Sequence, residues 1–177
     1  AFSNWAADEL KRGDELDEMT PTGRFGIAHA PDQARVYVGF AAGSGITPIL
    51  SIVKGGLARE PNSRFFLFYG NRSTSSMLFL EELEELKDRF MQRLSLFHVI
   101  SGEEQDIPIL HGRLDGEKVR VLLRSLLPAS SVDHVFICGP IGMSADLEAR
   151  CRDIGIPEDR IHVERFVSEF GGKPRPK

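Results

Sequence analysis

Five short apolar runs recur along the chain. In each run the apolar residues are nearly continuous and rich in β-branched and aromatic side chains, a pattern typical of strands that are buried on both faces of a sheet. The predicted strands are Arg35–Phe40, Arg64–Gly70, Leu94–Ile100, His134–Cys138 and Arg160–Glu164.

Longer stretches with helical spacing separate these runs. In the second of them Leu78, Leu83, Leu86 and Phe90 recur at helical intervals beneath a charged face, which predicts a helix packed on one side. The predicted helices are Pro48–Arg59, Ser75–Arg93, Gly116–Leu127 and Gly142–Ile154. Alternation of strand and helix predicts an α/β fold of three αβα layers, with a five-stranded parallel sheet and right-handed crossovers. Ligands of such sheets bind at the carboxyl ends of the strands.

The two ends of the chain follow other patterns. A helix is predicted over Asn4–Leu10, and Glu15–Met19 alternates as a strand does. The last residues, GGKPRPK, combine prolines, glycines and cations with nothing to pack, which is typical of a linker.

Composition restricts the class of protein. The chain has 177 residues, 41% of them hydrophobic, and a formal net charge of -4, which suits one well-buried domain. Its charges are mixed in sign, so a nucleic-acid surface is disfavoured. No apolar run approaches the roughly 20 residues that cross a bilayer, and the N-terminus lacks the layout of a secretory signal. We therefore expect a cytoplasmic protein without a membrane segment.

The sequence gives little support for disulfide bonds or for a metal site. Cys138 and Cys151 do not make a disulfide framework, and neither has a second Cys or a His at metal-ligand spacing. The five histidines stand singly in the sequence, whereas zinc would require paired ligands. Surface or capping roles are therefore favoured for the histidines, and no metal site is predicted.

The segment GSGITP follows the first predicted strand. Gly43 and Gly45 allow a sharp turn and a close approach of a ligand to the backbone. Thr47 is predicted to cap the next helix, and Pro48 suits its first turn. N–H groups at a helix N-terminus suit a pyrophosphate. By this pattern alone, a phosphate site and a purely structural turn are equally supported.

A second glycine-proline turn, CGPIGM, follows the fourth predicted strand and also opens a helix. Two such strand ends together favour a cleft between adjacent strands. Cys138 would line that cleft, or would simply be a small buried residue at a strand end. No histidine is paired with it in the sequence, which disfavours thiol catalysis.

These turns form part of a longer ordered pattern. GSGITP after the first strand, YGNRS after the second, CGPIGM after the fourth and VERF at the last resemble the pyridine-nucleotide domain of the ferredoxin-NADP reductase superfamily. The resemblance covers Gln33 to Phe166, and the preceding residues are similar to the tail of that family's flavin barrel. YGNRS and HGRLDGEKV resemble in particular the reductase components of multicomponent oxygenases, of the phenylacetyl-CoA epoxidase type.

The resemblance implies an enzyme that passes hydride from NAD(P)H to FAD, and single electrons from there to a [2Fe-2S] centre. The implied electron acceptor is an oxygenase component or a ferredoxin domain, which would serve the degradation of phenylacetate or another aromatic compound. Because the cofactors supply the chemistry, the protein would act mainly by positioning one ring on the other.

The resemblance also implies the roles of individual residues. Those that would hold the pyrophosphate and the nicotinamide edge are Gly43, Ser44, Gly45, Thr47 and Pro48. Those that would floor the nicotinamide pocket are Cys138, Gly139, Pro140 and Met143. Glu164 and Phe166 would lie beside the flavin ring, and Ser3 would touch the flavin phosphates. The residues with implied catalytic roles are Cys138, Glu164 and Thr47.

The choice between NADPH and NADH depends on the residues after the second strand. An NAD-selective fold usually places a carboxylate there, whereas this chain has Asn71, Arg72 and Ser73. Arg72 could pair with a 2′-phosphate. Against this, Glu103 and Glu104 follow the third strand and would repel a phosphate. The balance slightly favours NADPH.

Two interpretations from other classes stay open. The domain could sense a nicotinamide nucleotide without transferring hydride, as a binding module. Alternatively, the glycine turns could be structural parts of an α/β scaffold with no ligand.

The resemblance suggests a division of the chain into three parts. Residues 1–32 would be the C-terminal remnant of an FAD-binding barrel, residues 33–167 the NAD(P)-binding domain, and residues 168–177 a linker. The family's flavin-binding motif, an arginine followed by an aromatic residue and serine, does not occur in these 177 residues, and neither does a cysteine cluster. FAD and the [2Fe-2S] centre would therefore be held largely by other segments of a longer parent protein.

We predict that the 177-residue chain retains FAD weakly or not at all, because most of the barrel that would enclose the flavin is missing. Mixing the chain with FAD, followed by gel filtration and measurement of flavin absorbance, tests this. Stoichiometric yellow protein would contradict the prediction.

Overall fold

A computed structural model of the chain describes residues 2–18, 20 and 23–166. Five strands form one sheet in the order β3-β2-β1-β4-β5, and every neighbouring pair is parallel. The strands are β1 (Val36–Ala42), β2 (Arg64–Asn71), β3 (Leu94–Ile100), β4 (His134–Cys138) and β5 (Ile161–Glu164). The predicted five-stranded parallel sheet is confirmed.

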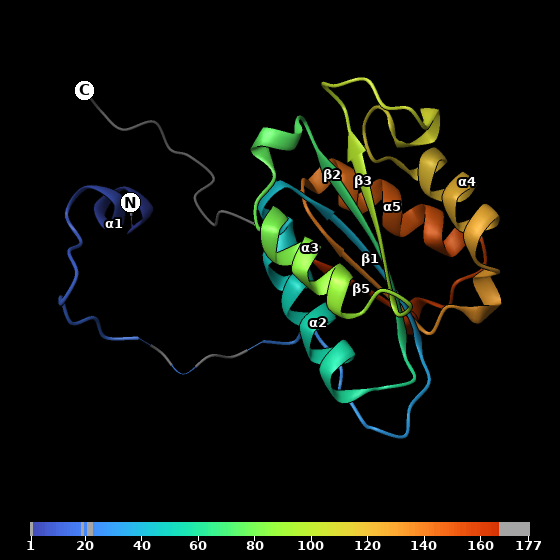
Figure 1. The fold of residues 1–177 in the computed structure, drawn as a ribbon, viewed down its shortest axis with the longest axis horizontal. Coiled ribbons are helices and arrows are strands. Elements are labelled where there is room, and N and C mark those ends of the chain that lie inside the picture. The colour runs from blue at the N-terminus through green and yellow to red at the C-terminus, as the bar shows by residue number, and fades with distance from the viewer. Residues whose placement is uncertain (1, 19, 21–22, 167–177) are drawn as a thin grey trace.

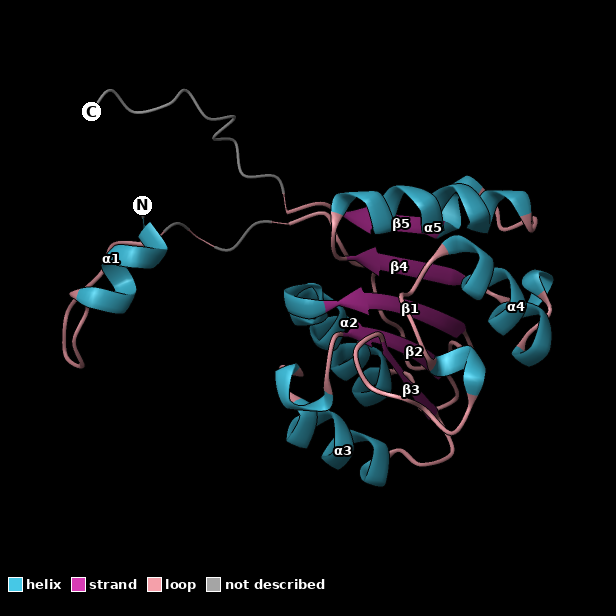
Figure 2. Ribbon diagram, turned by 90° about the horizontal axis from the view of Figure 1, so that it is seen from above, coloured by secondary structure: helices cyan, strands magenta, loops and turns pink. Residues whose placement is uncertain are grey.

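Helices cover both faces of this sheet (Figures 1 and 2). They are α2 (Ile46–Arg59), α3 (Leu80–Arg89), α4 (Gly116–Leu126) and α5 (Ile141–Asp153). One hydrophobic cluster joins α2 and α3 to the face that carries Tyr37 and Phe65. A second cluster joins α4 and α5 to the face that carries Phe40 and Phe68. The three αβα layers are therefore also as predicted.

Chain order and spatial order diverge at the centre of the sheet. The chain runs from β1 outward through β2 to β3, and then returns to place β4 on the other side of β1. Loops that leave the carboxyl ends of β1 and β4 consequently turn to opposite faces and leave room between them. In an open parallel sheet this reversal is where ligands bind.

The N-terminal part contains a short helix, α1 (Phe2–Asp8), which stands apart from the sheet (Figures 1 and 2). This agrees with the predicted helix to within a few residues. The strand predicted over Glu15–Met19 is wrong in its described part, because residues 15–18 form no strand. An alternating segment needs a partner strand to become stable, and none lies beside it. Met19 itself lies outside the described residues.

None of the described helices has the length and apolar character that crossing a bilayer requires. The longest of them, α2, has 14 residues.

The helix predicted over Ser75–Arg93 is shorter in the structure. A 3-10 turn, η2 (Thr74–Ser76), comes first, and α3 begins only at Leu80. The Leu78 N–H donates to the hydroxyl of Tyr69 (3.2 Å), which draws this part of the chain out of helical conformation. Leu78 is therefore 45% exposed rather than part of the packed face.

Glu60 is fully buried near the amino ends of the strands. Its carboxylate accepts hydrogen bonds from the hydroxyls of Tyr37 and Ser63 (2.7 Å each) and from the Ala30 N–H (3.2 Å), and it contacts Arg35 Nη1 at 3.0 Å. Burial alone would raise the pKa of Glu60. The hydrogen bonds and the charge of Arg35 outweigh burial and hold that pKa below its ordinary value.

We expect the substitution Glu60→Gln to lower the free energy of unfolding at neutral pH by about 2 kcal/mol, because Arg35 loses its anionic partner. A depressed pKa stabilises the fold above the pKa of the unfolded chain, and this stabilisation is lost as the pH falls through the folded value. Urea unfolding at about pH 7 and about pH 3.5 should therefore show the deficit shrinking in acid.

The control for this prediction is Glu85→Gln, which removes the charge of an exposed glutamate. It should change stability little at either pH. A deficit for Glu60→Gln that is equal at both pH values would contradict the assignment of the stabilisation to the ionised carboxylate.

Candidate nucleotide site

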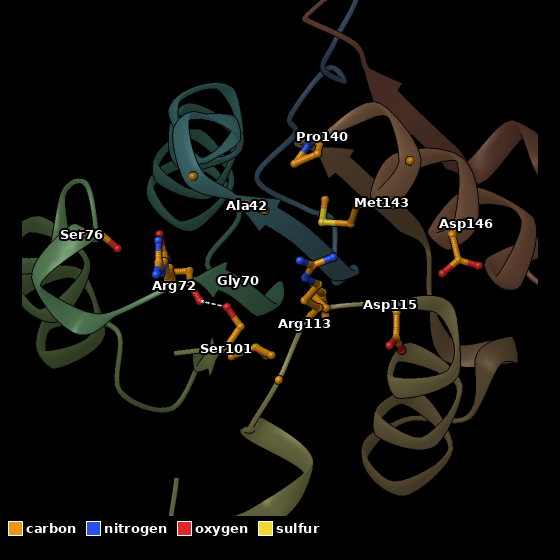
Figure 3. Close-up of a pocket in the computed structure, with 16 residues that line it drawn as sticks. Ala42, Gly70, Arg72, Ser76, Ser101, Arg113, Asp115, Pro140, Met143 and Asp146 are labelled. Carbon is orange, nitrogen blue, oxygen red and sulfur yellow. Dashed lines mark hydrogen bonds between the residues drawn. The ribbon is translucent and has the colours of Figure 1, made fainter. Parts of the chain in front are cut away.

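A pocket of about 770 Å³ opens at the carboxyl ends of the central strands, at the reversal between β1 and β4. Its walls come from the ends of β1 and β2, the loop after β3 and the first turns of α5. Figure 3 shows Arg72 and Ser76 on one side, Asp115 and Asp146 on the other, and Arg113 between them. The volume is within the range of pockets that hold cofactors.

The glycine turn after β1 forms a 3-10 turn, η1 (Gly43–Gly45), that leads directly into α2. Gly43 lines the pocket and has a φ of 52°, a left-handed conformation that glycine adopts without strain. A Cβ built on it would meet no atom within 4 Å, so its backbone is open to a ligand.

Gly45 serves a different purpose from Gly43. A Cβ at this position would lie 2.2 Å from the carbonyl oxygen of Cys138 and 2.8 Å from the Gly139 nitrogen. The missing side chain thus lets the start of α2 pack against the end of β4. Gly43 and Gly45 were both expected to let a ligand approach the backbone, but only Gly43 has open space beside it.

Thr47 does not cap α2, so that prediction is wrong. The helix begins at Ile46 with Gly45 at the N-cap, which places Thr47 inside the first turn. The Thr47 hydroxyl donates instead to the carbonyl oxygen of Ser44 (3.0 Å). That carbonyl lies four residues before Pro48, which has no N–H to offer it. Thr47 is exposed and lies in a smaller hollow with Phe79 and Lys54.

The three predicted residues after β2 divide between two roles. Asn71 and Arg72 line the pocket, and the Asn71 amide nitrogen Nδ2 is buried without a hydrogen-bond partner. Ser73 exchanges hydrogen bonds with Ser76 in a capping box that shapes the following turn. The buried Asn71 amide lies within reach of the Tyr69 phenol behind the pocket, whereas Ser73 holds the loop together.

After β4, the pocket is lined by Pro140, Gly142 and Met143, but not by Cys138 or Gly139. Cys138 is fully buried. Burial, and next the charge of Glu164, raises the pKa of its thiol to about 11, so the thiol is neutral at physiological pH. This agrees with the expectation that Cys138 is not a nucleophile.

The remaining predicted residues lie outside the pocket. Glu164 ends β5 in register with Cys138 and is half-buried, and Phe166 is 50% exposed. Ser3 falls in α1, but its side chain lies outside what the structure describes. The predicted residues that do not line the pocket are Ser3, Ser44, Gly45, Thr47, Pro48, Ser73, Cys138, Gly139, Glu164 and Phe166.

Sequence reasoning assigned no site role to the pocket wall that comes from the loop after β3, although HGRLDGEKV, which contains Arg113, was part of the resemblance. Arg113 lies in this wall, and Leu114 anchors it against the backbone at Gly70, where a Cβ would meet the Leu114 Cβ at 3.3 Å. The strand order could have indicated this wall, because a loop that follows β3 must start at the carboxyl edge of the sheet, beside β2. No regular hydrophobic pattern marks where it returns to that edge.

The charged side chains of the pocket are Arg72 on one side, Asp115 and Asp146 on the other, and Arg113 between them (Figure 3). Neither guanidinium, of Arg72 or of Arg113, has a hydrogen bond or ion pair with another residue in the described part of the chain. The two carboxylates are engaged, because Asp115 accepts from the Lys118 N–H (2.8 Å) and Asp146 from the Gly116 N–H (2.6 Å). The two arginines therefore offer free cationic donors to an anion in the pocket.

Glu103, expected to repel a phosphate, has a partner of its own. Its carboxylate accepts from the backbone N–H of Thr74 (3.0 Å) and from the Thr74 hydroxyl (2.7 Å). Neither Glu103 nor Glu104 lines the pocket. Among the described residues, no three His, Cys, Asp or Glu side chains gather in a way that could hold a metal ion.

A family model described as the oxidoreductase NAD-binding domain matches residues 40–149, which span the pocket from the end of β1 to α5. The chain belongs to this family. It is thus an NAD-binding domain of the ferredoxin-reductase type, as its four ordered motifs predicted.

Known relatives of this NAD-binding domain include components of oxygenase systems. It is 44% identical over 165 residues to one of the subunits of the 1,2-phenylacetyl-CoA epoxidase of Escherichia coli, covering 93% of this chain and 46% of that protein. It is 32% identical over 166 residues to the ferredoxin reductase component of a 3-ketosteroid-9-alpha-monooxygenase from Mycolicibacterium smegmatis, covering 94% and 43%. The chain therefore spans less than half the length of these relatives.

Solved structures share the fold of the NAD-binding domain. The flavohem-like FAD/NAD-binding domain of nitric oxide dioxygenase from Vibrio cholerae superposes with a TM-score of 0.75 at 26% identity. That match covers 93% of this chain and 63% of the other.

We expect Gly45→Ala to destabilise the NAD-binding domain by about 3 kcal/mol, because its Cβ would overlap the Cys138 carbonyl. The matched control is Gly142→Ala, whose Cβ would meet nothing within 4 Å in the first turn of α5 and should be neutral or stabilising by up to about 1 kcal/mol. Thermal unfolding of both variants measures this difference. Equal melting temperatures would contradict the close approach of α2 to β4.

Proposed function

We propose that this chain carries the nicotinamide-nucleotide site of a flavin-dependent reductase that serves an oxygenase. The pocket is the observation that carries the proposal. An open turn at Gly43 and the free guanidiniums of Arg72 and Arg113 converge at the reversal of a parallel sheet. The membership of the chain in a family of NAD-binding oxidoreductase domains supports the same function.

The pocket residues suit the parts of a dinucleotide. The bare backbone of Gly43 would face the pyrophosphate, together with the N–H groups that open α2. Asn71, which lines the pocket at the end of β2, would lie beside the ribose or phosphate groups. Pro140 and Met143 provide an apolar wall for the nicotinamide half. The predicted residues outside the pocket, including Gly45 and Gly139, would shape these loops from behind.

The flavin would approach at the edge formed by β4 and β5. FAD, when bound by the rest of such a protein, accepts a hydride and releases electrons singly. Phe166 offers an exposed aromatic face, and Glu164 offers a half-buried carboxylate, at the carboxyl end of β5. Thr47 offers an exposed hydroxyl at the start of α2. Cys138, with a neutral buried thiol, would support the nicotinamide floor by packing and would not transfer a proton.

An iron-sulfur cluster does not fit this chain. A [2Fe-2S] cluster of the ferredoxin type needs four thiolates, whereas the chain has two cysteines, both buried. In our proposal the centre that receives electrons therefore belongs to another segment of the parent protein or to a ferredoxin or oxygenase component. The relatives named as epoxidase and monooxygenase components support an oxygenase as the final acceptor.

We further propose that the site prefers NADPH to NADH. Arg72, on the β2 side of the pocket, and Arg113, in its middle, present two unpaired cations to a bound nucleotide (Figure 3). A 2′-phosphate there would form charge-assisted hydrogen bonds that NADH cannot form. Glu103 and Glu104, the acids that would repel a phosphate, do not line the pocket, and Glu103 is directed to Thr74.

Titration calorimetry of the 177-residue chain with NADP⁺ and NAD⁺ tests the proposed function. Arg72→Ala and Arg113→Ala should each weaken NADP⁺ binding by about tenfold, and NAD⁺ binding much less, because a charge-assisted hydrogen bond contributes roughly 1.5–3 kcal/mol. Arg64→Ala is the control, since Arg64 is an exposed arginine at the opposite end of β2.

Equal losses for the two nucleotides would remove the assignment of the arginines to a 2′-phosphate. Absence of binding by the wild-type chain would overturn the nucleotide site itself.

A further inference from the structure

The hydroxyl of Tyr69 connects two loops of the pocket from behind. Tyr69 lies near the end of β2 and is fully buried. Its oxygen lies 3.2 Å from the Gly43 carbonyl oxygen and 3.2 Å from the Leu78 nitrogen. Gly43 belongs to the turn after β1, and Leu78 belongs to the loop after β2 that also carries Arg72 and Ser76.

The direction of these hydrogen bonds follows from their chemistry. The Leu78 N–H can only donate, so the phenol oxygen accepts from it. The single phenol proton is then available for the Gly43 carbonyl, which is nearer than the alternative acceptor, the Leu78 carbonyl oxygen at 3.5 Å. Burial raises the pKa of the Tyr69 phenol, which keeps that proton in place. The result is a relay from the Leu78 N–H through Tyr69 to the Gly43 carbonyl.

This relay sets the orientation of one peptide plane in the glycine turn. The Gly43–Ser44 peptide is trans, so the Ser44 N–H points opposite to the Gly43 carbonyl. A carbonyl held toward buried Tyr69 leaves the Ser44 N–H pointing away from the sheet interior, where Ser44 is exposed. Ser44 does not itself line the pocket, but it directly follows Gly43, which does, so this N–H lies beside the pocket opening. Ser44 lies in the first turn of the continuous η1–α2 segment, so its N–H has no helical acceptor and is free for a ligand.

Within the turn, the Gly43 carbonyl accepts a hydrogen bond that it shares with the Ser44 carbonyl. The Ile46 N–H contacts both the Gly43 and the Ser44 carbonyl oxygens, as in a tight 3-10 turn. Gly43 itself is in the left-handed region, where glycine moves between conformations at little cost. The local sequence of the turn therefore does not fix this peptide plane firmly by itself.

We infer that Tyr69 is a positioning residue for the dinucleotide diphosphate: its hydroxyl holds the Gly43–Ser44 peptide so that the Ser44 N–H faces the ligand. The inference rests on the proposed function and extends it to a residue that never touches the nucleotide. It separates Tyr69 from the arginines, because NADP⁺ and NAD⁺ carry the same diphosphate. Loss of the hydroxyl should therefore weaken both nucleotides by the same factor.

The test is Tyr69→Phe in the 177-residue chain, with dissociation constants for NADP⁺ and NAD⁺ from calorimetry and a melting temperature for each variant. We expect both constants to rise about five- to tenfold, the effect of one neutral hydrogen bond of ordinary strength. The matched control is Tyr37→Phe, which removes another buried tyrosine hydroxyl at the amino end of β1. It should lower the melting temperature without changing either constant.

A second variant, Gly43→Ala, approaches the same peptide from the other side. Its Cβ would meet no atom within 4 Å, but a left-handed φ disfavours alanine, so the turn should shift and again weaken both nucleotides alike.

Several results would overturn the inference. These are constants for Tyr69→Phe within twofold of the wild type, a loss confined to NADP⁺, or an equal loss in Tyr37→Phe. A wild-type chain that binds neither nucleotide would instead overturn the proposed function, and this inference with it.

Discussion

The contact between the glycine turn and the end of β4 determines the arrangement of the pocket. The Cys138 carbonyl occupies the space where a side chain on residue 45 would stand, so α2 starts directly against the neighbouring strand. That close approach keeps the loops after β1 and β4 on either side of one opening. The phosphate-binding backbone and the nicotinamide wall of the proposed site are thus fixed relative to each other by packing, without any ligand.

Sequence periodicity was sufficient for the fold, because strands buried on both faces and helices packed on one face leave strong patterns. All five strands and the four helices around the sheet were predicted to within a few residues, except for α3. There the decisive interaction joins Leu78 to Tyr69, nine residues earlier in the chain, and no local pattern reports it. The prediction that Thr47 caps α2 was wrong because the 3-10 turn at Gly43–Gly45 leads straight into the helix, so Thr47 already lies inside its first turn.

For the site, motif reasoning located the strand ends but could not separate residues that face the pocket from residues that support it. Gly43, Asn71 and Arg72 line the pocket, whereas Gly45 and Cys138 pack against each other behind it. The two kinds look alike in a glycine-rich sequence, and only the packing behind them distinguishes them. The position of Arg113 could not be predicted for the same reason. Its loop has no regular pattern, and tertiary contacts such as that of Leu114 with Gly70 bring it back to the sheet edge.

The segment before β1 has a course with a further consequence. Phe25 packs edge-on against Phe136 in the middle of β4, and His29 and Ala30 then contact Glu60 at the amino ends of the strands. The incoming chain thus runs beside the sheet from the direction of its carboxyl edge, where β5 also ends, to its amino edge, where β1 begins (Figure 2). Polypeptide attached on either flank would be tethered beside the pocket, which raises its effective concentration there without any added affinity.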